Sequence, residues 1–62
     1  MNQEELKLRV KKFIAEFNQP IAAFARNVGF DRSAYYKWIK GSDVFSEKRL
    51  QSIDAYLKKY DF

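Results

Sequence analysis

The chain has 62 residues, of which 47% are hydrophobic and 18% aromatic, and its formal net charge is +4. This length predicts a single domain over residues 1–62, and the apolar fraction, which is high enough to build a core, argues against a disordered chain. Cysteine and histidine are both absent, which excludes a disulfide framework, thiolate metal sites and histidine-based catalysis.

The positive net charge favours an acidic partner, and nucleic acid is the first candidate. The sequence contains no run of about 18 apolar residues that would span a membrane. Its N-terminal segment MNQEELKLR lacks the apolar core of a signal peptide. We therefore expect a soluble cytoplasmic protein with no membrane partner.

The first predicted helix covers residues 4–17. Asn2 is a good N-cap, and the acidic residues Glu4 and Glu5 suit the positive end of the helix dipole. Apolar residues recur at helical spacing at Leu6, Val10, Phe13, Ile14 and Phe17. The other face carries Lys7, Arg9, Lys11 and Lys12. We interpret these cations as a solvated face in preference to a row of contacts to a DNA backbone.

Residues 21–41, IAAFARNVGFDRSAYYKWIKG, predict two short helices joined by a tight turn. The preceding Asn18-Gln19-Pro20 ends the first helix and starts the second, because proline is tolerated in a first turn. The second helix has an apolar face of Ile21, Phe24, Ala25 and Val28. Gly29 can take the left-handed conformation that ends a helix, Phe30 fills the turn, and Asp31 is a good N-cap. The third helix buries Tyr35, Trp38 and Ile39 and ends at Gly41.

A connector over residues 42–45 leads to the fourth predicted helix. We expect the apolar pair Val44 and Phe45 to pack against the core. Ser46 is the predicted N-cap, and Leu50, Ile53, Leu57 and Tyr60 follow at helical spacing. No segment alternates in the manner of a strand. The sequence therefore predicts an all-α domain of four helices.

The motif residues resemble those of a known family. The spacing of Phe24-Ala25, Gly29-Phe30, Tyr35, Trp38 and Gly41 is similar to that of the phage repressor and Cro superfamily, of the xenobiotic-response-element type. The resemblance implies a lambda-repressor-like helix-turn-helix domain whose recognition helix, residues 31–40, enters the major groove of DNA. Proteins of that superfamily usually begin the first motif helix with a glutamine that contacts a phosphate. This chain has Ile21 there, and Gln19 lies nearby.

The exposed face of the recognition helix supplies the candidate DNA-binding residues. Arg32 can make a bidentate contact to guanine, and Ser33 can donate or accept at either kind of base pair. Lys37 and Lys40 suit phosphates as flexible point charges. Tyr36 can pack on a thymine methyl group or reach a phosphate. The full set is Arg32, Ser33, Tyr36, Lys37, Lys40 and Gln19.

Two functions compete for this surface. The leading interpretation is a sequence-specific transcriptional regulator that binds double-stranded DNA. The alternative is an antirepressor that uses the helix-turn-helix surface to bind a partner repressor protein. An enzyme is poorly supported, because no clustered pair of catalytic side chains is recognisable, and we expect no cofactor and no metal. The aromatic residues Tyr56, Tyr60 and Phe62 exceed what a short helix needs for its own core, from which we expect a homodimer on DNA.

Overall fold

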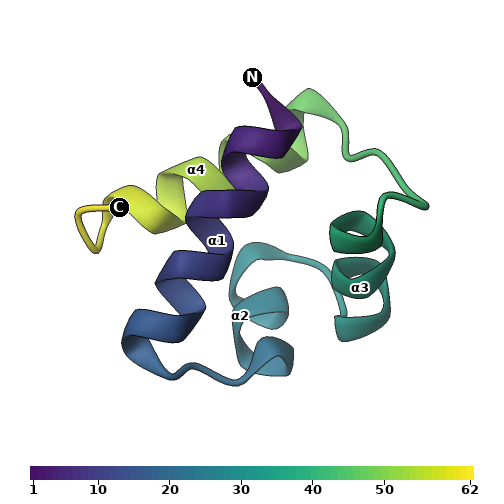
Figure 1. The fold of residues 1–62 in the computed structure, drawn as a ribbon. Helices are drawn as coiled ribbons and strands as arrows, with labels where there is room; N and C mark the ends of the chain where they lie inside the picture. Colours follow the sequence, from purple (N-terminus) through teal and green to yellow (C-terminus); the bar gives the residue numbers. More distant parts are fainter.

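The computed structural model describes residues 1–62 and contains four α-helices and no strand (Figure 1). The helices are α1 (Gln3–Phe17), α2 (Ile21–Val28), α3 (Arg32–Lys40) and α4 (Glu47–Lys58). The prediction of an all-α chain with four helices is therefore confirmed. α1 begins one residue before the predicted start at residue 4, within the uncertainty that fraying gives any helix end.

Local side-chain chemistry sets the helix ends. The side chains of Asn2, Asp31 and Ser46 each accept a hydrogen bond from the backbone N–H three residues later, as the three predicted N-caps require. Gly29 and Gly41 follow α2 and α3 in the left-handed conformation, with φ of 98° and 93°. The turn between α2 and α3 therefore forms where the sequence predicted it. Pro20 is the N-cap of α2 and makes no side-chain capping bond.

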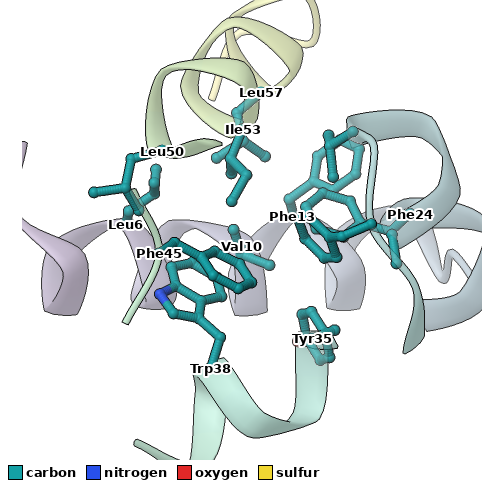
Figure 2. Close-up of a cluster of buried hydrophobic side chains, with 13 residues drawn as sticks. Leu6, Val10, Phe13, Phe24, Tyr35, Trp38, Phe45, Leu50, Ile53 and Leu57 are labelled. Carbon is teal, nitrogen blue, oxygen red and sulfur yellow. The ribbon is translucent and has the colours of Figure 1, made fainter. Parts of the chain in front are cut away.

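The core lies where the four helices meet. α1 packs against α4, and α2 packs against both α3 and α4. Phe13 is a centre of aromatic contact, with its ring centroid 5.9 Å from that of Phe24 (Figure 2). Its centroid also lies 5.6 Å from that of Tyr56. The buried hydrophobic residues are Leu6, Val10, Phe13, Phe24, Ala25, Val28, Phe30, Tyr35, Trp38, Phe45, Leu50, Ile53 and Leu57. Ile14, Ile21 and Ile39 are only partly buried at the edge of this cluster.

The expected burial of both Val44 and Phe45 is wrong for Val44. Phe45 is buried and stacks on Trp38, with the ring centroids 4.8 Å apart and the planes 10° apart (Figure 2). The side chain of Val44 is 75% exposed. Phe45 is held in place by Trp38 and by the hydrogen bonds of its backbone with Gln3, whereas Val44 is not among the residues that pack against the core.

The C-terminal aromatic residues pack within the chain. Tyr60 lies beyond the end of α4 and is 43% exposed, so it does not continue the apolar face of that helix as expected. The rings of Tyr60 and Phe62 both contact Phe13, at centroid distances of 5.2 and 5.5 Å. Phe17, expected on the buried face of α1, is 48% exposed and lies against the same two rings. Much of the aromatic surface that suggested a homodimer is thus used internally, and the dimer stays a prediction.

Two of the four cations expected on the solvated face of α1 are engaged with the protein. Lys7 is buried, with its Nζ donating to Glu4 at 3.0 Å and lying 5.8 Å from the centre of the Trp38 ring. Arg9 donates through Nη1 to Asp54 of α4 at 2.7 Å. Lys11 and Lys12 are exposed as expected. Long side chains can turn back from the edge of a helix face, which helical periodicity alone does not reveal.

The carboxylate of Asp54 makes the stability of the domain depend on pH. Hydrogen bonds donated by Arg9, and then by Lys58, hold its pKa below the ordinary value. Because the folded state binds this proton more weakly than the unfolded state, the pairing stabilises the fold above about pH 4 and is lost as the pH falls through the lowered pKa.

We therefore expect Asp54→Asn to lose less stability than the parent on acidification from about pH 5 to pH 2. Urea unfolding midpoints measured across this range test the expectation. Asp61→Asn is the matched control, because Asp61 is exposed and makes no ion pair. If the urea midpoints of the parent and of Asp54→Asn fell equally with pH, the lowered pKa of Asp54 would be contradicted.

Candidate nucleic-acid interface

The exposed face of α3 forms one wall of a shallow concave surface of about 690 Å³. Four of the predicted residues line it together, Ser33, Tyr36, Lys37 and Lys40, and Ser42 and Asp43 complete it. We call these six residues the α3 surface. Arg32 is exposed at the first position of α3 but is not among the lining residues. The helical periodicity thus brings most of the predicted set to one place.

Packing of the opposite face fixes which side chains of α3 point outward. Tyr35 is 4% exposed and Trp38 is fully buried, so the residues between them turn toward solvent. The Tyr35 ring packs edge-on against Phe24 of α2. Burial, and secondarily the neighbouring Tyr36, raise the pKa of the Tyr35 hydroxyl above its ordinary value. Tyr35 is therefore neutral at physiological pH and adds no negative charge beside the lysines.

The cations of α3 are free to meet an external anion. Arg32, Lys37 and Lys40 make no ion pair within the chain, whereas Lys7, Arg9 and Lys58 are each paired with a carboxylate. The acid nearest in sequence to Arg32 is Asp31, whose carboxylate accepts the N–H of Ala34 at 2.7 Å as the N-cap. The positive charge of α3 is therefore not neutralised by a partner of its own.

Ser42 and Asp43 belong to the surface although the predicted motif ends at Gly41. Their backbone N–H groups both donate to the carbonyl of Lys37, at 2.9 and 3.2 Å, which folds the connector back over the last turn of α3. The Asp43 carboxylate in turn accepts the N–H of Val44 at 2.9 Å. The left-handed Gly41 was the available signal, because the chain that follows such a cap returns toward the helix it ends.

Gln19 does not join the α3 surface. Its Nε2 donates to the hydroxyl of Tyr56 on α4 at 3.2 Å, and Asn27 donates to the same oxygen at 3.2 Å. Burial by itself would raise the pKa of Tyr56, but these donated hydrogen bonds outweigh it and lower the pKa. The Oε1 of Gln19 is buried without a hydrogen-bond partner. The amide thus faces the α2–α4 contact, and Gln19 is not among the residues that line the α3 surface.

A second, smaller concave surface of about 300 Å³ lies between the α2–α3 turn and the start of α4. It contains none of the predicted DNA-binding residues. Its Arg49 stacks over the rings of Phe45 and Phe30, with the guanidinium carbon 4.9 and 5.4 Å from their centres. Because this side chain packs on core aromatics, we assign it a structural role.

No group of three acidic side chains is placed to hold a metal ion. None of the four helices has the length and apolar character needed to cross a membrane. Comparison of the chain with protein-family models, with curated proteins and with solved structures found no match, so the resemblance to the repressor and Cro superfamily stays a prediction that depends on the motif residues.

Proposed function

We propose that this chain is a sequence-specific DNA-binding regulator of the phage repressor and Cro type, acting in the cytoplasm with α3 in the major groove. The observation that carries the proposal is the exposed face of α3, where Arg32, Lys37 and Lys40 lie without an acidic partner. Bound at an operator, such a domain would block or recruit RNA polymerase.

The dimensions of α3 suit this role. The major groove is about 12 Å wide and admits an α-helix, whose diameter with side chains is about 10–12 Å. The nine residues of α3 give it a length of about 13.5 Å along the groove. Arg32 and Ser33 are at the N-terminal end of α3, the part of a recognition helix that contacts base edges. Lys37 and Lys40 lie further along and would bind phosphates. Base reading and backbone binding are thus assigned to different ends of one helix.

A protein partner is the second candidate. Tyr36 is 51% exposed on the α3 surface, and Val44, which follows Asp43 in the sequence, is 75% exposed. Asp43 is an acid on this surface, and its carboxylate would repel a nearby phosphate. These features favour an antirepressor that binds a repressor protein. In that case Tyr36 would act as a buried aromatic anchor and the lysines at the rim would contribute little.

Titration against duplex DNA at several salt concentrations distinguishes the two functions. We expect Lys37→Ala and Lys40→Ala each to weaken binding to all sequences and to lower the salt dependence by about one unit of slope, because one fewer counterion is released. We expect Arg32→Ala to lose about 1–3 kcal/mol mainly on the preferred sequence, because it removes a base contact.

Lys11→Ala on the exposed face of α1 is the matched control. The salt dependence of its DNA binding should equal that of the parent. The probes are a duplex selected by the protein from a randomised pool and a scrambled duplex of the same length. Absence of binding to either duplex at low salt would contradict the proposal. Tight binding to a repressor protein, abolished by Tyr36→Ala, would establish the second candidate instead.

A further inference from the structure

The carboxamide of Gln3 joins three parts of the chain. Its Oε1 accepts a hydrogen bond from Trp38 Nε1 of α3 at 2.7 Å and another from the backbone N–H of Phe45 at 3.2 Å. Its Nε2 donates to the carbonyl of Phe45 at 3.1 Å. One side chain at the first position of α1 thus binds both α3 and the connector, across 35 and 42 residues of sequence.

Only an amide fits these partners. Two N–H groups require one oxygen with two lone pairs, and the carbonyl requires a donor on the adjacent atom. A carboxylate would keep both accepted bonds but would set an oxygen against the carbonyl of Phe45. An apolar side chain would leave three polar groups of partly buried segments without their partner.

In the sequence, these bonds are made to one residue within the span of the α3 surface and to one that follows it closely. Trp38 lies between Lys37 and Lys40, and Phe45 follows Ser42 and Asp43. α3 packs mainly against α2, so Gln3 supplies the direct polar link from α1 to α3. Tyr35 and Trp38 hold α3 against the core by packing, and this amide adds a directional link that helps to set the orientation of the α3 surface relative to α1.

We propose that Gln3 is a positioning residue for DNA recognition, an inference that rests on the proposed function. It acts through Trp38 and Phe45, and its own polar atoms are bound within the protein. Base edges are read only when a side chain arrives in a narrow range of positions, whereas flexible lysines follow a displaced phosphate. Loss of the amide will therefore reduce sequence preference more than it reduces non-specific affinity.

The test compares Gln3→Met with the parent on the selected and the scrambled duplex. We expect about fivefold weaker binding to the selected duplex, near the low end of what one well-placed base contact contributes, with the scrambled duplex little affected and the salt slope unchanged. The indole N–H resonance of Trp38 and the amide resonance of Phe45 should shift. Gln51→Met makes the same chemical change at an exposed position of α4 and should alter none of these quantities.

Gln3→Glu keeps both acceptor bonds and loses only the donor. It should keep the indole N–H of Trp38 hydrogen-bonded, with its resonance displaced in the direction of a stronger bond, whereas Gln3→Met should displace it in the opposite direction. This variant replaces Gln3→Met if the latter does not fold. Equal losses on both duplexes would mean a general loss of stability and would overturn the proposal, as would unchanged binding with shifted resonances. If the parent binds no duplex, the proposed function fails, and the resonances still show whether Gln3 holds the connector.

Discussion

Replacement of Trp38 by alanine is expected to unfold most of the domain at room temperature. Trp38 is fully buried, stacks on Phe45, and donates to Gln3 at 2.7 Å. Truncation of a buried aromatic residue to alanine costs about 3–5 kcal/mol. A core in a chain of this size supplies about 3–5 kcal/mol in total, so little net stability would remain. Far-UV circular dichroism followed through a urea titration measures the effect.

Tyr36→Ala is the matched control for this loss. It removes an aromatic ring from the same helix, but the ring is 51% exposed, and we expect a change within about 0.5 kcal/mol. If Trp38→Ala unfolds at the urea concentration of the parent, the core described here is wrong. If Tyr36→Ala is as damaging as Trp38→Ala, the outward face of α3 has been assigned incorrectly.

The helix boundaries could be predicted because their causes are local. A cap needs only a side chain and the backbone within a few residues, so Asn2, Asp31 and Ser46 were recognisable from their types and positions. The same holds for Gly29 and Gly41, which tolerate a left-handed conformation that costs other residues energy. Helical periodicity then separates the buried from the exposed face of each helix.

The wrong expectations concern contacts between distant segments. Nothing local distinguishes Val44 from Phe45, and the choice of Phe45 for the core follows from its stacking on Trp38 and its bonds to Gln3. Burial of Lys7 depends likewise on the Trp38 ring, which reaches it from another helix. The contact of Phe62 with Phe13, which the sequence pattern did not indicate, forms because the chain turns after α4. Such pairings require knowledge of the three-dimensional arrangement.

In the candidate site, too, residues within a helix were predictable from the sequence, whereas residues outside it were not. Ser33, Tyr36, Lys37 and Lys40 lie within one helix, so periodicity placed them on one surface correctly. Ser42 and Asp43 lie past the end of α3, where helical periodicity no longer predicts the direction of a side chain, and they were missed. Gln19 was chosen by its closeness in sequence to the motif, but its amide faces Tyr56. Residues in irregular segments thus needed the structure before they could be assigned.

Overpacking of α2 and strain in the turn after it are expected to destabilise the packing of α2 against α3. Ala25 is fully buried, and leucine there must displace neighbouring side chains, at a cost of about 1–3 kcal/mol. Gly29 has a φ of 98°, and a Cβ at this position would meet no atom within 4 Å. The cost of Gly29→Val is therefore backbone strain, of at least about 1 kcal/mol, because a β-branched residue is disfavoured in the left-handed region.

Matched variants separate these causes in thermal unfolding measurements. Ala15→Leu makes the Ala25→Leu change at an exposed position of α1 and should leave the melting temperature almost unchanged. Gly29→Asn should recover part of the stability lost in Gly29→Val, because asparagine tolerates positive φ better. Melting of Ala25→Leu and Gly29→Val at the parent temperature would contradict the assignment of α2, the turn and α3. Equal losses in Gly29→Asn and Gly29→Val would instead show that the β-branch adds nothing to the strain at this glycine.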